Sequence, residues 1–173
     1  MSKVIIIAVD AMGGEDSPLK VINGINHHFQ NNKNVFYKIF GDTKKIKDII
    51  PKTLPSSSFE LVHTDEEVKG TDSALSAAKR GKNTSMWLAI DSVKKKESNI
   101  IISAGNTGAL FVIAKLNLEM IENIDKPALS GLWPNKNGTS IVLDLGANIE
   151  CGEKNLIDFC LMGSALFKAL YQN

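Results

Sequence analysis

The chain has little net charge, few cysteines, almost no arginine and no long hydrophobic run. Its 173 residues hold 20 lysines and arginines against 19 acidic residues, which leaves a net charge of +1. So small a charge excludes the strong positive field of proteins that bind nucleic acid without regard to sequence. Two cysteines are too few for a disulfide framework and favour a reducing compartment. We therefore expect a cytoplasmic protein that binds no nucleic acid.

The first apolar run covers only residues 4–9 before Asp10 ends it. Six residues are too few for the apolar region of a signal peptide, and a membrane-spanning helix needs about 20. The hydrophobic fraction of 43% is meanwhile too high for a disordered chain. The length lies within the ~100–200 residues usual for a domain, which predicts one α/β domain over residues 1–173.

Short β-branched runs alternate with helical patterns, which predicts a mostly parallel sheet. Residues 128–133 and 139–143 are joined by only five turn-forming residues, so they are expected to form an antiparallel hairpin. Residues 64–82 are polar and aperiodic and predict a long loop with a helical turn. Asp16 or Ser17 is expected to cap the first helix, and Asp42 the second. The remaining strands are predicted over residues 4–9, 35–40, 59–63 and 99–103, and helices over 18–30, 43–49, 84–96, 107–121 and 154–170.

The strongest chemical signal lies where a strand, expected to be buried, runs directly into a helix. The segment is Ser103-Ala104-Gly105-Asn106-Thr107-Gly108. Its glycines allow close backbone approach, and the amides and positive end of the helix suit a phosphate or another oxyanion. A tight strand-to-helix turn capped by Asn106 or Thr107 explains the same residues without a ligand. The pattern alone therefore indicates an anion site and no specific ligand.

Two further loops follow predicted strands, and ligands of open α/β sheets bind at such strand ends. The first loop holds three acidic residues around Gly13 and Gly14. These acids could position a hydroxyl, a metal or a neighbouring loop, and a glycine turn with solvated acids is the plainer interpretation. The second loop holds Asp144 and Asn148. Those two side chains reach the same edge only if their strand runs parallel to the first.

A compact cationic group, Lys79-Arg80-Gly81-Lys82, contains the only arginine of the chain. Among 19 lysines, one retained guanidinium suggests a need for its fixed bidentate fork. The group suits a phosphate or an acidic partner, and a solvated charged face explains it equally well. Cys151 as a nucleophile and His63 as a general base are weaker candidates, with inert packing and strand capping as the alternatives. Cys151 and Cys160 do not have the spacing of metal ligands, and we expect no metal and no cofactor.

Four segments occur in a fixed order: IAVDAMGG (7–14), RGKNTSM (80–86), SAGNTGA (103–109) and LDLGAN (143–148). Together they resemble the PlsX-type phosphate acyltransferases, which are bacterial enzymes of phospholipid synthesis. One departure is Glu15, because the family normally has aspartate after the two glycines. The other departure is length, because family members are about twice as long. The resemblance therefore covers their amino-terminal half.

The resemblance implies a three-layer α/β/α fold like that of the isocitrate and isopropylmalate dehydrogenases. It implies a homodimer that transfers an acyl group from acylated acyl carrier protein (acyl-ACP) to inorganic phosphate without a cofactor. Peripheral contact with the inner face of the membrane is implied for the full-length protein. Catalytic roles are implied for Asn106, Arg80 and Asp10. The implied phosphate- or substrate-binding positions are Gly13, Gly14, Lys82, Ser103, Gly105, Thr107, Gly108, Asp144 and Asn148.

Three functions fit these residues. The first is the amino-terminal portion of such an acyltransferase, active or inactive by itself. The second is a module that binds an anion or an ACP-like partner without catalysis. The third is a phosphotransacetylase-like enzyme that uses acyl-CoA, which carries the same phosphopantetheine thioester as acyl-ACP. Because the last helix is apolar on most of its surface, we expect self-association or contact with a missing half.

Overall fold

A computed structural model describes residues 4–171 of the chain. These residues form two compact units, and the chain divides between them after Leu118. Such units can be parts of one domain or separate domains, so a single domain over residues 1–173 stays a prediction. In chain order the elements are β1 (Ile5–Asp10), α1 (Leu19–Asn31), β2 (Val35–Gly41), α2 (Thr43–Lys47), η1 (Ser56–Ser58), β3 (Phe59–His63), α3 (Ala74–Arg80), α4 (Ser85–Lys94), β4 (Ile100–Ser103), α5 (Thr107–Asn117), β5 (Ser130–Asn135), β6 (Gly138–Leu143) and α6 (Glu153–Tyr171).

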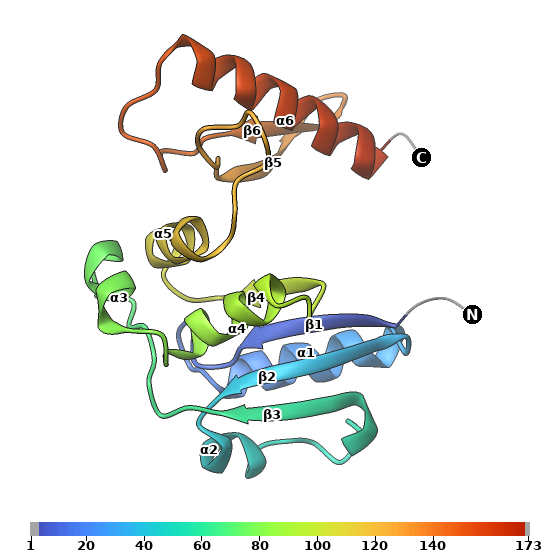
Figure 1. The fold of residues 1–173 in the computed structure, drawn as a ribbon. Coiled ribbons are helices and arrows are strands. Elements are labelled where there is room, and N and C mark those ends of the chain that lie inside the picture. The colour runs from blue at the N-terminus through green and yellow to red at the C-terminus, as the bar shows by residue number, and fades with distance from the viewer. Residues whose placement is uncertain (1–3, 172–173) are drawn as a thin grey trace. The chain divides into compact units, whose positions relative to one another are not determined.

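A four-stranded parallel sheet organises the amino-terminal unit (Figure 1). Its strand order is β3-β2-β1-β4, so β1 pairs with β2 on one side and with β4 on the other. Helices lie in the connections between the strands, as parallel pairing requires. The α/β fold with a mostly parallel sheet is therefore confirmed.

Helices cover both faces of this sheet, with an apolar core under each. On one face Ile7 packs with Ile22 of α1. On the other face Ala8 packs with Ala89 of α4. Neighbouring residues of β1 thus point to opposite helical layers, as the two-residue period of a strand requires. A strand buried on both faces shows no polar alternation, which explains the continuous apolar run in residues 4–9.

The segment between β3 and α4 is more ordered than a loop. Its helix α3 is capped by the Ser73 hydroxyl, which accepts a hydrogen bond from a backbone amide of the first turn. Ala77 of α3 and Val68 are buried in a core shared with α4 and α5. The prediction of a long loop with a helical turn is therefore wrong in part. The alanines and serines of α3 do not produce a clear alternation of apolar and polar residues at helical spacing, so the sequence did not predict the helix. Arg80 lies in the last turn of α3.

Of the caps predicted for the first two helices, one is observed and the other is not. Asp42 accepts hydrogen bonds from two backbone amides of α2, which confirms its predicted role. Neither Asp16 nor Ser17 caps α1, and the prediction of a cap there is wrong. The Ser17 hydroxyl instead donates to the Gly13 carbonyl at 2.6 Å, so the preceding loop already uses it.

The burial predicted for one strand and the end predicted for one helix of the amino-terminal unit also differ from the structure. β4 is only partly buried, because it forms an edge of the sheet and leaves Ile100 and Ile102 exposed. The expectation of a fully buried strand is therefore wrong. Helix α5 ends at Asn117, before the predicted residue 121.

The carboxyl-terminal unit contains the predicted antiparallel hairpin, made of β5 and β6. β5 continues through Pro134 to Asn135, which pairs with Gly138. The five-residue turn predicted over 134–138 is therefore wrong, and only Lys136 and Asn137 connect the strands. Proline fits here because a strand of a two-stranded sheet has one side without ladder hydrogen bonds.

Helix α6 packs on β6 with one side and exposes apolar side chains elsewhere. Phe159 is buried, and a Cβ added to Gly163 would lie 2.8 Å from Leu143 Cδ1. Leu156 and Leu161 are by contrast 57% and 63% exposed. Self-association through this surface stays a prediction. Among residues 4–171, no helix is both long enough and apolar enough to cross a membrane.

Replacing Ile22 by alanine should destabilise the amino-terminal unit. Ile22 is fully buried in the core between α1 and the sheet, so Ile22→Ala leaves a cavity that costs about 2–5 kcal/mol. Leu19→Ala, on the same helix, should cost far less, because Leu19 is 50% exposed. Urea unfolding followed by circular dichroism measures both. Equal losses would contradict the assigned face of α1.

Candidate functional site

A polar crevice lies at the carboxyl edge of the parallel sheet. It has a volume of about 690 Å³ and is lined by three segments of the amino-terminal unit. These are the loop after β1 with the start of α1, the segment before α3, and the loop between β4 and α5. The lining residues are Met12, Gly14, Glu15, Asp16, Ser17, Lys20, Glu67, Val68, Lys69, Gly70, Ala104, Gly105 and Asn106.

Asp10 is buried and connects segments that border the crevice. The residue is 1% exposed and is the last residue of β1. Its two carboxylate oxygens accept hydrogen bonds from the Ser85 hydroxyl at 2.6 Å and the Ser103 hydroxyl at 2.7 Å. The carboxylate therefore joins the ends of β1 and β4 to the start of α4. Ser85 was not among the predicted site residues, although it lies within the second sequence motif.

Gly13 and Gly14 allow the loop after β1 to lie directly on the loop after β4. A Cβ on Gly13 would be 2.5 Å from Asp10 Oδ2 and 2.9 Å from the Gly105 nitrogen. A Cβ on Gly14, whose φ is +98°, would be 2.7 Å from the Ala104 carbonyl oxygen. Only glycine fits at either position without a shift of the backbone. The structure thus brings together the predicted residues Gly13, Gly14, Ser103 and Gly105.

Asn106 caps α5 and also anchors the segment before α3. Its Oδ1 accepts a hydrogen bond from the Ala109 amide at 3.0 Å. Its Nδ2 donates to the carbonyl oxygens of Gly70 and Asp72, at 3.1 and 2.8 Å. The capping expected of Asn106 is therefore confirmed, and the same side chain also holds the crevice wall, while a role toward a ligand stays a prediction.

Arg80 anchors the same segment from the other side. Its guanidinium donates to Asp72 Oδ1 at 2.7 Å and to the Glu67 carbonyl oxygen at 3.0 Å. The hydrogen bond from Arg80 lowers the pKa of the Asp72 carboxyl, and Asp72 in turn raises the pKa of the guanidinium. The need for a forked donor inferred from the lone arginine is thus met by this chain's own residues 67 and 72.

The cations that line the crevice are two lysines that the sequence did not single out, Lys20 and Lys69. Lys20 forms an ion pair with Asp16 at 3.1 Å, one helical turn away. The first-turn amides of α5, at Thr107 and Gly108, have no preceding helical carbonyl to bond and add partial positive charge near Asn106. Among so many surface lysines, no spacing distinguishes the two that line the crevice.

Three of the predicted site residues line the crevice: Gly14, Gly105 and Asn106. Besides Lys82, the amino-terminal unit holds six others that do not line it, namely Asp10, Gly13, Arg80, Ser103, Thr107 and Gly108. Lys82 is exposed and is not among the lining residues. Asp144 and Asn148 belong to the carboxyl-terminal unit, where Asn148 Nδ2 donates to Asp144 Oδ1 at 3.0 Å and to the Pro127 carbonyl oxygen at 2.9 Å. Their strand β6 pairs with β5 in a two-stranded sheet of its own, so a place for both residues at the edge with Asp10 stays a prediction.

The remaining candidate side chains are engaged or solvated. His63 lies at the end of β3, and its Nδ1 accepts a hydrogen bond from the Thr43 amide. Its Nε2 lies 3.4 Å from Asp65 Oδ1. Asp42, His63 and Asp65 have potential metal-ligand atoms within 4.8 Å of one another, but Asp42 already caps α2. The expectation that no metal takes part stays a prediction. Cys151 and Cys160 are both exposed, so packing in a core does not account for Cys151.

Comparison with known proteins gives a consistent result over almost the whole chain. Residues 5–173 match a protein family described as Fatty acid synthesis protein. The chain is 71% identical over 171 residues to a phosphate acyltransferase of Pelagibacter ubique, covering 99% of this chain and 51% of that protein. It is 42% identical over 168 residues to a phosphate acyltransferase of Bradyrhizobium diazoefficiens, covering 95% of this chain and 47% of that protein. The chain thus spans about half the length of these curated relatives.

Two glycine substitutions separate close loop packing from helix propensity. Gly13→Ala should destabilise the chain by about 1–3 kcal/mol, because the new methyl group meets Asp10 and the Gly105 backbone. Gly24→Ala in α1 should instead be neutral or stabilise by up to about 1 kcal/mol, since nothing lies within 4 Å of its Cβ. Chemical denaturation measures both variants. A neutral Gly13→Ala variant would contradict the described loop contact.

The contribution of the Asp72–Arg80 ion pair to the free energy of unfolding should depend on pH. The folded-state pKa of Asp72 is lowered, so its stabilising effect is complete above the unfolded-state pKa of about 3.9 and is lost as pH falls through the folded value. Asp72→Asn should therefore be less stable than the parent chain at pH 7, and the two should converge progressively as the pH falls from about 4 through the folded-state pKa of Asp72. Urea unfolding across this range tests the sign. A stability difference that is the same at every pH would count against the ion pair.

Proposed function

Because the chain belongs to the Fatty acid synthesis protein family, we propose that it is the phosphate-binding part of a phosphate acyltransferase. The proposed reaction transfers an acyl group from acyl-ACP to inorganic phosphate. The observation that carries the proposal is the start of α5 beside the crevice, where Asn106 caps the helix and binds the opposite wall. The names of the relatives from Pelagibacter and Bradyrhizobium support the reaction class.

The backbone donors beside the crevice suit a small oxyanion. Lys20 and Lys69 face three acidic lining residues, Glu15, Asp16 and Glu67, and Lys20 pairs with Asp16. The first-turn amides of α5, which add partial positive charge near Asn106, therefore carry the argument. The tight approach of Gly13 and Gly14 to the loop after β4 brings the two loops within van der Waals distance. Such backbone-lined corners at the carboxyl ends of parallel strands are typical anion sites of open α/β sheets.

The proposed chemistry requires positioning more than a dedicated nucleophile. A phosphate oxygen attacks the thioester carbonyl carbon, so a carbon–oxygen bond forms and the carbonyl oxygen becomes an oxyanion. The oxyanion then collapses and the carbon–sulfur bond breaks. The thiol has a pKa of about 8.5 and leaves as a thiolate that takes a proton from water. Holding two anionic reactants together and stabilising the oxyanion supplies most of the required acceleration.

In this proposal the three residues expected to be catalytic all act by positioning. Both amide hydrogens of Asn106 already bond to the carbonyl oxygens of Gly70 and Asp72, so Asn106 holds the crevice wall beside the first-turn amides of α5. Arg80 is a positioning residue, because Asp72 and the Glu67 carbonyl already occupy its guanidinium. Asp10 is also a positioning residue, since it is buried and bound by two serine hydroxyls.

The proposal extends to the setting in which the whole enzyme works. It is a homodimer in the cytoplasm that reaches the inner face of the membrane peripherally. The exposed apolar surface of α6, which includes Leu156 and Leu161, supports association with another surface. Large exposed apolar patches on soluble proteins commonly mark such contacts.

Substitution of Asn106 should abolish acyl-phosphate formation. Asn106→Ala removes the donors to residues 70 and 72 together with the helix cap, whereas Asn106→Ser keeps an oxygen that can cap α5. Both variants should lose at least about 100-fold in rate, and Asn106→Ala alone should also lose about 0.5–2 kcal/mol of stability. Asn32→Ala, at the distant end of α1, should leave the rate unchanged.

The assay traps acyl phosphate with hydroxylamine after incubation with acyl-ACP and phosphate, and a parallel arm uses acyl-CoA. It is run on the chain alone and on the chain fused to the half of the Pelagibacter relative that it does not cover. The intact relative is the positive control. Phosphate-dependent product from the fusion with acyl-ACP supports the proposal. Product with acyl-CoA alone, or no product from the fusion beside an active relative, contradicts it.

A further inference from the structure

The first residue of α4, Ser85, lies behind the crevice, where the segments that line it begin. Ser85 is 1% exposed and is not among the lining residues, so it does not contact a ligand there. Its hydroxyl donates to Asp10 Oδ1 at 2.6 Å, and its amide donates to the Glu66 carbonyl oxygen at 3.0 Å. These two partners lie just before the lining loop after β1 and just before the lining segment that leads to α3. One residue therefore holds the starting points of two walls.

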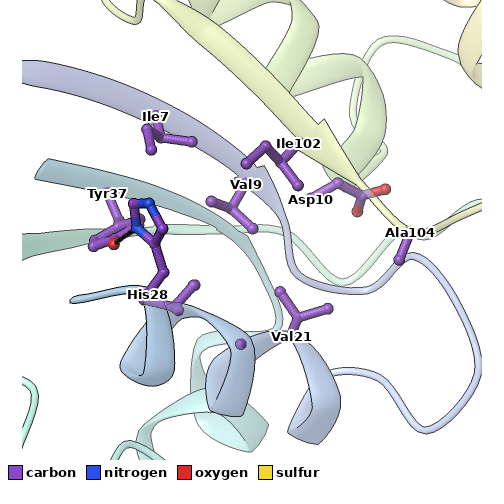
Figure 2. Close-up of a pocket in the computed structure, with 10 residues that line it drawn as sticks. Ile7, Val9, Asp10, Val21, His28, Tyr37, Ile102 and Ala104 are labelled. Carbon is purple, nitrogen blue, oxygen red and sulfur yellow. Dashed lines mark hydrogen bonds between the residues drawn. The ribbon is translucent and has the colours of Figure 1, made fainter. Parts of the chain in front are cut away.

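Asp10 extends the contact to the third lining segment, the loop between β4 and α5. Its Oδ2 accepts a hydrogen bond from the Ser103 hydroxyl at 2.7 Å, and the Ser103 oxygen accepts one from the Gly105 amide at 3.1 Å. Asp10 also lines an apolar pocket of about 300 Å³ beside α1. Figure 2 shows that its carboxylate points away from Val9 and toward the loop at Ala104. A continuous chain of hydrogen bonds thus runs from α4 to the loop that begins α5.

α4 is a rigid base for these bonds. Met86 and Ala89 are fully buried, and Thr84 caps the first turn by accepting a hydrogen bond from the Trp87 amide. A Cβ added to Gly105 would be 3.0 Å from Met86 Cε, so the start of α4 also supports that loop by direct packing. Supporting residues on a rigid helix fix a site more precisely than residues on loops do.

A second buried serine of α4 offers a matched comparison. Ser92 is 3% exposed, and its hydroxyl bonds to the Ser98 hydroxyl at 2.8 Å. That pair joins α4 to the turn before β4, and neither residue lines the crevice. Ser85 and Ser92 are therefore alike in burial and in hydrogen bonding, and they differ in what they position.

We propose that Ser85 is a positioning residue for inorganic phosphate, which holds the lining segments at the separation that lets the first-turn amides of α5 bind the anion. The inference rests on the proposed function, since it takes phosphate as the ligand of the crevice. Loss of the hydroxyl removes the closest donor to Asp10 Oδ1, so the carboxylate and the Ser103 hydroxyl bound to it shift. A displacement of about 1 Å in such a support costs up to about 100-fold.

The first test measures binding and needs no catalysis. Inorganic phosphate is titrated into the isotope-labelled chain, and NMR follows the amide signals of Thr107 and Gly108. Ser85→Ala should raise the dissociation constant for phosphate by at least about tenfold. Ser85→Thr keeps a hydroxyl and Ser92→Ala removes an unrelated one, so both should leave the constant unchanged.

The second test measures turnover in the fusion with the uncovered half of the Pelagibacter relative. Ser85→Ala should raise the KM for phosphate by at least about tenfold and leave the KM for acyl-ACP unchanged. A residue that only stabilised the fold would reduce the amount of active enzyme and leave both KM values in place. Urea unfolding verifies that Ser85→Ala and Ser92→Ala are folded. Ser85→Cys, which nearly keeps the volume but donates only weakly, takes the place of Ser85→Ala if that variant does not fold.

Each outcome decides the proposal. Weaker phosphate binding in Ser85→Ala, with Ser85→Thr and Ser92→Ala unchanged, supports it even if the fusion makes no product, a result that contradicts only the proposed reaction. Equal effects of Ser85→Ala and Ser92→Ala overturn it, and so does a rise confined to the KM for acyl-ACP, which would assign the positioned group to phosphopantetheine. Signals of Thr107 and Gly108 that phosphate does not move in the unsubstituted chain also overturn it. Phosphate-dependent product that Ser85→Ala does not alter overturns this inference alone and leaves the proposed function standing.

Discussion

The buried carboxylate of Asp10 is the interaction on which the crevice depends. It lies at the end of the central strand β1 and binds Ser85 at the start of α4 and Ser103 at the end of β4. A carboxylate removed from water needs such partners, because each unsatisfied oxygen would cost free energy. The same bonds fix where the loop after β4 leaves the sheet, and Gly13 can approach that loop only from this position.

The outer wall of the crevice is held by a second set of bonds that converge on one short segment. Asn106 binds it from α5 and Arg80 binds it from α3, while Val68 is buried in the core of those helices. The segment therefore has a defined position without being helix or strand. This explains why two residues that belong to recognisable motifs point into the protein's own backbone: they build the wall that a ligand would meet.

The fold could be predicted from the sequence farther than the site could. A continuous apolar run predicted β1, and a run interrupted only by Lys38 predicted β2. Strand ends placed the glycine loops at one edge, because those signals are local. Local patterns could not show that Ser17 bonds to Gly13, that Arg80 pairs with Asp72, or that β6 belongs to a separate sheet. Each of these depends on which segments meet in space. Lys20 and Lys69 were missed for the same reason, since surface lysines carry no positional signal.

The polar groups of the crevice and the apolar side chains of β4 differ in how well the amino-terminal unit accommodates them. Polar groups near Asp10 and Asn106 find their partners within the amino-terminal unit, so the crevice is organised by local and mid-range contacts. Ile102, on the edge strand β4, is by contrast 52% exposed. Ligand sites of open α/β sheets lie at the carboxyl ends of their strands. The strands that border the crevice therefore suffice to shape it, whatever lies against β4.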